Sequence, residues 1–252
     1  MTCDLFSLKG NFAIVTGASD GIGRSIALGF AKAGVNLALI SRTMKETLLN
    51  ELKSYGVIVT WHEFDFSLPA HIPELVETIY REFGEVHILV NNAGTQRRSD
   101  SVDFSEEDWD FVHNVNEKSV FFMCKEVGKR MIKNGHGKII NMASLLSFQG
   151  GFRVPAYAAS KGGVAQFSKS LANEWASKNI NINCIAPGYI ATEMNQALIA
   201  DEVRSEQILV RIPAGRWGRP DDLVGTAIFL ASAASDYVNG IVIPVDGGWL
   251  GR

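Results

Sequence analysis

The sequence predicts a single-domain α/β fold, a doubly wound parallel β-sheet of about seven strands flanked by helices. Three observations predict it. Short apolar runs alternate regularly with helical stretches along the chain. A glycine-rich turn joins the first apolar run to the first helical stretch. The chain has 252 residues, 46% of them hydrophobic and 20% charged, so it can bury one large core, and we expect residues 1–252 to form one domain.

The expected strands are short apolar runs rich in β-branched residues, at residues 12–16, 36–40, 57–64, 87–91, 138–141, 181–186 and 241–245. Helices are expected between them, at about residues 24–33, 45–55, 72–83, 105–134 and 156–178, and from about residue 221. The connection over residues 189–216 is longer than usual and is interrupted at Pro213. We expect it to form a mobile cover over a cleft.

The glycine-rich turn follows the first strand directly and opens the first helix. This geometry places backbone N–H groups at a helix amino terminus, where a pyrophosphate can bind, and a Cβ atom would block its approach. The spacing T-G-x-x-x-G-I-G differs from G-x-G-x-x-G, but the flanking strand and helix support a Rossmann-type dinucleotide site. The expected cofactor contacts here are Gly17, Ser19, Asp20, Gly21, Ile22 and Gly23.

Ser41 and Arg42 stand where the second strand ends. An acidic side chain at this place accepts hydrogen bonds from a ribose 2′-hydroxyl, whereas an arginine suits a 2′-phosphate. Because no Asp or Glu is present, the residues favour NADP. Arg42 could equally stack on adenine or lie in solvent.

Tyr157 and Lys161 are four residues apart in an expected helix that begins just after Pro155, so both should point the same way. A cation beside a phenol lowers the phenol's pKa, which makes the two residues a candidate proton-transfer pair. Ser144, at the end of the fifth strand, offers a hydroxyl nearby. The alternative is that Tyr-x-x-x-Lys arises by chance, with a half-buried Tyr and a solvated Lys.

Two other positions suggest function. Arg97 and Arg98 follow the fourth strand, at the edge of the sheet where ligands bind; a solvated basic loop is the alternative. Asn116 lies inside the expected helix 105–134, where Asn is a poor helix former. It could open the helix and hold a water, or it could be exposed on the surface.

Composition excludes several other classes of function. A net charge of −3 without long blocks of like charge argues against nucleic-acid binding. Residues 1–10 lack a signal-peptide pattern and no apolar run approaches 18 residues, so we expect a cytoplasmic protein without membrane contact. Cys124 and Cys184 are expected to be buried thiols, and Cys3 has no evident partner. No histidine pair has metal-ligand spacing, and we expect no metal site.

Together these residues resemble the short-chain dehydrogenase/reductase family over essentially the whole chain. The matching motifs, in chain order, are Thr16-Gly17-x-x-x-Gly21-Ile22-Gly23, Asn91-Asn92-Ala93-Gly94, Asn116, Ser144, Tyr157-x-x-x-Lys161, Pro187-Gly188 with Thr192, and Val245-Asp246-Gly247-Gly248. The resemblance implies an NAD(P)-dependent enzyme that interconverts a secondary alcohol and a ketone. It also implies a homotetramer.

The resemblance implies a role for each matching residue. Tyr157 would be the acid or base, Lys161 would lower its pKa and bind the nicotinamide ribose, and Ser144 would hydrogen-bond the substrate oxygen. Asn116 would anchor a water linked to Lys161. Further cofactor contacts would come from Asp65, Phe66, Asn91, Ala93, Gly94, Pro187, Gly188, Ile190 and Thr192.

Within the family, the segments 147–151, 173–176, 211–218 and 235–240 resemble enzymes that act on sugar acids. A substrate carboxylate needs a cation, for which Arg97, Arg98 and Arg153 are the candidates, and Gln149 is a further candidate substrate contact. This subgroup is usually described with NAD(H), in conflict with the reading of Ser41 and Arg42, so the cofactor stays NAD(P). The alternatives are an enzyme for another hydroxy or keto sugar acid, and a protein that senses dinucleotides without catalysis.

Overall fold

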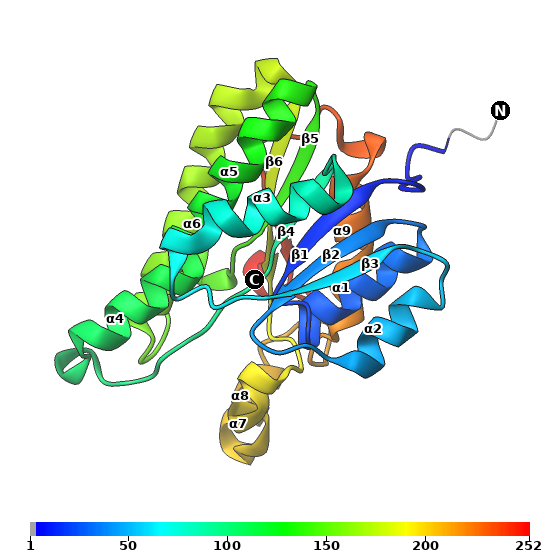
Figure 1. The fold of residues 1–252 in the computed structure, drawn as a ribbon. Coiled ribbons are helices and arrows are strands. Elements are labelled where there is room, and N and C mark those ends of the chain that lie inside the picture. The colour runs from blue at the N-terminus through cyan, green and yellow to red at the C-terminus, as the bar shows by residue number, and fades with distance from the viewer. Residues whose placement is uncertain (1–3) are drawn as a thin grey trace.

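The computed structural model describes residues 4–252 and contains one seven-stranded sheet, in the order β3-β2-β1-β4-β5-β6-β7 (Figure 1). All neighbouring strands are parallel, as predicted. The strands are β1 (Phe12–Thr16), β2 (Asn36–Ser41), β3 (Val59–Glu63), β4 (Ile88–Asn91), β5 (Gly137–Met142), β6 (Ile180–Pro187) and β7 (Val242–Val245).

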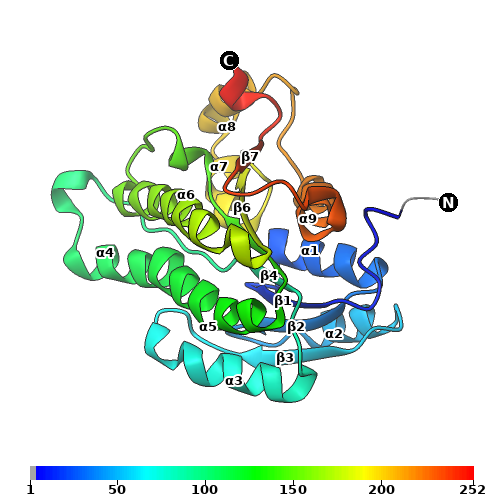
Figure 2. The ribbon, with the colours of Figure 1, turned by 90° about the horizontal axis from the view of Figure 1, so that it is seen from above.

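Helices cover both faces of the sheet, and each face has its own apolar core (Figure 2). The helices are α1 (Gly21–Lys32), α2 (Glu46–Lys53), α3 (Ile72–Phe83), α4 (Glu106–His113), α5 (Ser119–Asn134), α6 (Pro155–Trp175), α7 (Gln196–Ala200), α8 (Glu202–Leu209) and α9 (Val224–Ala231). On one face α3, α5 and α6 pack on the sheet, and on the other α1, α2 and α9 do so. The central strands are buried on both sides, which explains their nearly continuous apolar sequences.

The long helix expected over residues 105–134 is divided. A π-helical turn, Asn114–Lys118, separates α4 from α5 and contains the buried Asn116. Such turns often occur at functional sites, because they re-aim a side chain that a regular helix would point elsewhere. The segment expected to cover a cleft, residues 189–216, contains α7 and α8.

The core contains a small polar network behind the carboxyl ends of β4 and β5. Asn91 donates to Asn141 Oδ1 at 2.8 Å and to Cys124 Sγ at 3.3 Å, and Asn141 donates to Ser168 at 2.9 Å. Cys124 and Cys184 are buried free thiols, as predicted, whereas Cys3 lies outside the described residues. Burial raises the pKa of the Cys184 thiol to about 11 and also raises that of Cys124, so both thiols stay protonated and inert.

The two edges of the sheet are β3 and β7. In β7, Pro244 pairs with Ala186 of β6, and the carbonyl groups of Ile241 and Val245 accept hydrogen bonds from Cys184 of β6 and from Gly188, which follows β6. Because the amide nitrogens of alternate residues point to opposite sides of a strand, the nitrogen of Pro244 lies on the free edge, where a proline can be accommodated.

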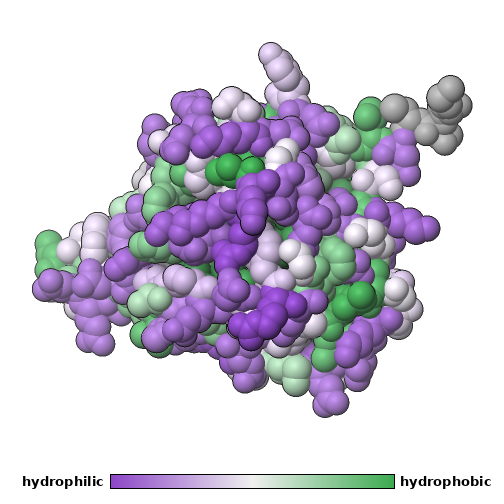
Figure 3. Space-filling view, turned by 45° about the horizontal axis from the view of Figure 1, so that its top comes forward, coloured by the Kyte–Doolittle hydropathy of each residue, from purple (hydrophilic) through white to green (hydrophobic). Residues whose placement is uncertain are grey.

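No helix between residues 4 and 252 combines the length and apolar character needed to cross a bilayer. On the face shown in Figure 3, hydrophilic residues predominate and hydrophobic residues lie in small separate groups.

Two glycines allow a matched test of helix packing. In α5, a Cβ on Gly128 would lie 2.5 Å from the Trp175 ring, whereas a Cβ on the exposed Gly225 of α9 would meet no atom within 4 Å. We expect Gly128→Ala to lower the free energy of unfolding by about 1–3 kcal/mol through overpacking. Gly225→Ala should raise it by up to about 1 kcal/mol. Urea unfolding measures both, and equal effects would contradict this account of the α5–α6 contact.

Candidate active site

A cleft of about 990 Å³ runs along the carboxyl ends of the strands. The strand order reverses between β1 and β4, so the following connections leave on opposite faces and open a crevice there. Most residues predicted to bind cofactor or substrate line this cleft. They are Gly17, Ser19, Asp20, Gly21, Ile22, Ser41, Arg42, Asp65, Phe66, Ala93, Gly94, Arg98, Ser144, Gln149, Arg153, Tyr157, Lys161, Pro187, Gly188, Ile190 and Thr192.

Gly23, Asn91 and Arg97 do not line the cleft. Gly23 lets α1 approach β1, because a Cβ there would lie 2.2 Å from the carbonyl oxygen of Gly17. The Asn91 side chain points into the core network. Arg97 pairs with Asp108 at 3.1 Å and lies over the ring of Phe111, so its guanidinium already has an anionic partner. The fold therefore gives these three positions structural contacts, and their predicted ligand contacts stay predictions.

The glycine-rich turn suits a pyrophosphate. Gly17 and Gly21 have φ angles of 63° and 55°, in the left-handed region that favours glycine. A Cβ on Gly17 would lie 2.8 Å from Ala93 Cα, so the turn packs directly on the loop after β4. Asn92 fixes this contact by donating to the carbonyl groups of Thr16 and Gly17. No side chain caps the first turn of α1, which leaves its N–H groups available to an anion.

Two cations line the end of the cleft beside β2. Ser41 is buried, donates to the Thr43 carbonyl and accepts from Trp61 Nε1, so its hydroxyl mainly orders the loop. Arg42 is exposed, lines the cleft and has no hydrogen bond or ion pair within residues 4–252. Lys45, which the sequence motifs did not indicate, lines the cleft too and lies 3.6 Å from Asp20. Two cations at the place of a 2′-phosphate suit NADP.

Tyr157 and Lys161 lie one turn apart in α6, with Lys161 Nζ 5.8 Å from the centre of the Tyr157 ring. Lys161 is 4% exposed and donates to the Met142 carbonyl at 2.6 Å, at the end of β5. Burial lowers the pKa of Lys161 to about 8, and the Cys184 thiol opposes this slightly. The predicted pair is therefore in place, facing one cleft.

The pKa of Tyr157 is shifted in the direction opposite to the prediction. Burial raises the pKa of Tyr157, and its hydrogen bond with Ser144 only partly opposes this rise. Burial also disfavours the charged form of Lys161, whose amine donates to the Met142 carbonyl. Tyr157 is thus a neutral phenol when the cleft holds no ligand, and further positive charge is required to make it a good acid.

Asn116 connects the π-helical turn to the cleft. It exchanges two hydrogen bonds of 2.8 Å with the backbone of Thr95 and donates to Ser160 Oγ at 3.2 Å. A Cβ built on Gly94 would lie 3.5 Å from Asn116 Oδ1 and 3.8 Å from Lys161 Nζ, so both side chains border one small space. The alternative of a surface-exposed Asn116 is wrong, since the residue is fully buried.

The outer end of the cleft is formed by two loops and the covering segment. Arg153 has a φ angle of 63° and pairs with Asp100 at 2.9 Å, and its carbonyl accepts from Ser99. This ion pair joins the loop after β4 to the loop before α6. Arg204, Arg211 and Trp249 also line the cleft, although no sequence motif marked them as ligand contacts. Only the fold shows that they converge there from segments distant in sequence.

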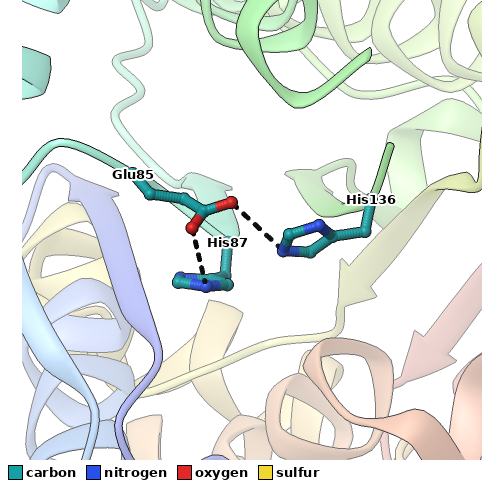
Figure 4. A group of neighbouring side chains, drawn as sticks. All are labelled: Glu85, His87 and His136. Carbon is teal, nitrogen blue, oxygen red and sulfur yellow. Dashed lines mark ion pairs between the residues drawn. The ribbon is translucent and has the colours of Figure 1, made fainter. Parts of the chain in front are cut away.

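One further titratable cluster lies at the opposite ends of the strands, where Glu85 lies between His87 and His136 (Figure 4). Sequence spacing offered no metal ligands, yet the ligand atoms of these three residues lie within 4.8 Å of one another. However, His87 Nδ1 accepts the Phe12 N–H at 3.1 Å, so a neutral ring carries its proton on Nε2, facing Glu85. A metal would have to displace that proton, and we interpret the cluster as hydrogen-bonded side chains.

Comparison with known proteins gives full-length matches. The family model described as enoyl-(acyl carrier protein) reductase matches residues 17–250. The 2-dehydro-3-deoxy-D-gluconate 5-dehydrogenase of Dickeya dadantii is 52% identical over 100% of both chains. A crystal structure from Agrobacterium tumefaciens with bound NADP is 48% identical, with a TM-score of 0.92, covering 99% of this chain and 100% of the other.

A crystal structure of a gluconate 5-dehydrogenase from Burkholderia cenocepacia, in complex with NADP and tartrate, is 40% identical with a TM-score of 0.95. The match covers 99% of this chain and 98% of the other. The names of these relatives agree with the subgroup that the sequence segments resemble.

The pKa of Tyr157 offers a test of the site without any ligand. We expect Ser144→Ala to raise this pKa further, because the hydrogen bond that lowers it is lost. The ultraviolet absorbance of phenolate during a pH titration measures the effect, after subtraction of the same titration of Tyr157→Phe. A lower pKa in Ser144→Ala would show that the two hydroxyl groups do not interact as described.

Proposed function

The chain belongs to the short-chain dehydrogenase/reductase family and is an NAD(P)-dependent oxidoreductase acting on CH–OH groups, and from this premise we propose that its substrate is a sugar acid. The activity supported best is that of a 2-dehydro-3-deoxy-D-gluconate 5-dehydrogenase, which interconverts a secondary alcohol and a ketone. One observation carries the proposal: the Tyr157–Lys161 pair and Ser144 share a cleft in a chain 52% identical over its full length to an enzyme of that name.

NAD(P)(H) supplies or accepts the hydride when bound. Tyr157 gives a proton to the carbonyl oxygen during reduction and takes it from the hydroxyl during oxidation, so charge does not build up on that oxygen. Ser144, whose hydroxyl is hydrogen-bonded to Tyr157, orients the same oxygen. Both side chains line the cleft, which supports a shared contact with the reacting oxygen.

Lys161 is the second partner of the proton transfer. Its amine has a pKa of about 8, so it carries a proton near neutral pH while buried beside Tyr157. We propose that it binds the nicotinamide ribose. Asn116 borders the same small space as Lys161, which supports a water between them that passes the proton to solvent.

We propose that residues 189–216 close over the substrate. Eleven residues between Tyr189 and Arg211 line the cleft, and α7 and α8 project from the rest of the domain in Figure 1. Closure would exclude water, which strengthens the electrostatic interactions in the site.

Gluconate 5-dehydrogenase activity is the second candidate, favoured by the 40% identity to the enzyme of that name. A screen of keto sugar acids against NADPH and NADH, followed at the absorbance of the reduced cofactor, separates the two candidates by kcat/KM. Absence of turnover with every sugar acid would contradict both.

We also propose a homotetramer in the cytoplasm. The exposed Phe121 of α5 contacts Phe122 and Phe167, which gives an apolar face on α5 and α6 suited to a partner subunit. Two buried free thiols are compatible with a reducing compartment. Size-exclusion chromatography with light scattering measures the assembly, and elution as a monomer would contradict it.

The phenol determines the expected pH dependence. Oxidation requires phenolate, and because the pKa of Tyr157 is raised, kcat/KM for oxidation should increase with pH from about pH 6 to about pH 9. Reduction requires the neutral phenol, so its kcat/KM should not increase over the same range. Tyr157→Phe should lower both at least about 100-fold while the binding of NADPH persists. Wild-type turnover in this variant would exclude Tyr157 as the acid or base.

The cations beside β2 determine the expected coenzyme preference. We expect Arg42→Ala to lower kcat/KM for NADPH about 10-fold to 100-fold, with little change for NADH, because a charge-assisted bond to the 2′-phosphate is lost. Lys45→Ala should act in the same direction. Arg24→Ala is the control, because Arg24 pairs with Glu51 and does not line the cleft. Equal losses for NADH and NADPH would contradict a 2′-phosphate site.

A further inference from the structure

We propose that Arg211 binds the carboxylate of the substrate and that Trp249 holds its guanidinium in position. The inference rests on the proposed function, since it assigns the acid group of the sugar acid to one residue. Sequence motifs favoured Arg97, Arg98 and Arg153 for this task.

Arg211 is a cation in the cleft without an anionic partner. It follows α8, and its guanidinium carbon lies 4.0 Å from the centre of the Trp249 ring. Within residues 4–252, its side chain makes no hydrogen bond and no ion pair. A guanidinium presents several N–H groups in one plane, which matches the two oxygens of a carboxylate.

Trp249 is a fixed platform for this cation. Its side chain is largely buried in a cluster with Leu145, Ile208 and Ile212, and its ring centre lies 4.7 Å from that of Tyr189. Its Nε1 donates to Gln149 at 3.3 Å. Stacking on a fixed ring restricts the guanidinium before substrate arrives, so less conformational entropy is lost on binding.

Three other arginines in or near this end of the cleft already have polar partners. Arg153 pairs with Asp100, and Arg204 donates to Gln207. Arg97 pairs with Asp108 outside the cleft. Arg98 lines the cleft without a recorded partner, but it stacks on no ring, and it is the competitor that the experiment must separate from Arg211.

The position of Arg211 also agrees with the chemistry of the proposed substrate. In a 2-dehydro-3-deoxy-D-gluconate, the reacting carbon is four bonds from the carboxyl carbon, an end-to-end distance of about 5 Å when the zigzag chain is extended with bonds of about 1.5 Å. Trp249 and Gln149 link Arg211 to the loop that follows Ser144. Arg211 and Tyr157 line the same cleft, so an acid held at Arg211 lies in the cavity that contains the phenol.

The test compares turnover of the keto acid with turnover of its carboxamide, which has no charge. Wild-type enzyme should prefer the acid. Arg211→Ala should lower kcat/KM for the acid about 10-fold to 100-fold and leave kcat/KM for the amide and the Kd of NADPH unchanged. Arg211→Lys keeps the charge but loses the planar fork, so its kcat/KM for the acid should lie between those of wild-type enzyme and Arg211→Ala. Arg97→Ala is the matched control, because Arg97 pairs with Asp108 and does not line the cleft, and it should keep the preference for the acid.

Two results of the turnover measurements would overturn the inference. One is an Arg211→Ala enzyme that still prefers the acid, and the other is loss of the preference in Arg98→Ala with Arg211→Ala unaffected. Calorimetric binding of D-gluconate to the NADP-loaded protein tests the same contact without turnover. If wild-type protein turns over no sugar acid, the proposed function fails, while weaker gluconate binding in Arg211→Ala still supports the carboxylate site. Equal gluconate binding in both proteins overturns it.

Discussion

The site depends on one buried amine. Lys161 sits at the end of the central strand β5 with its amine against the Met142 carbonyl, and burial lowers its pKa to about 8. Such a shift corresponds to about 3 kcal/mol at about 1.4 kcal/mol per pKa unit, free energy by which the surroundings disfavour the charged form. The sheet and α6 hold the residue there, so the fold keeps an amine near its titration point beside the phenol.

The two ends of the cleft offer different chemical groups. The turn after β1 offers backbone N–H groups and the loop after β2 offers Arg42 and Lys45, so the inner end is suited to a charged dinucleotide. At the outer end, the Arg153–Asp100 pair orders two loops, and Trp249 connects the covering segment to the loop of Ser144. Tyr157 lines the same cleft, where we propose that cofactor and substrate meet.

The sequence predicted the sheet, its parallel strands and the Tyr157–Lys161 pair, because these follow from local patterns: apolar runs, a glycine-rich turn and helical spacing. It could not show where a side chain turns at the end of a strand. Asn91 and Arg97 were therefore predicted to contact ligands, although core and surface partners hold them. The positions of Lys45, Arg204 and Arg211 in the cleft depend on tertiary packing between distant segments, for which no local signal exists. The direction in which the pKa of Tyr157 is shifted likewise depends on burial, which sequence spacing does not reveal.

Pro244 affects the tendency of the protein to aggregate at high concentration. An exposed edge of a parallel sheet is a template on which another chain can add a strand, and such addition is a route to aggregates. With a ring nitrogen on the open side of β7, one donor is missing from that template. The missing donor therefore weakens the addition of a further strand at this edge of the sheet.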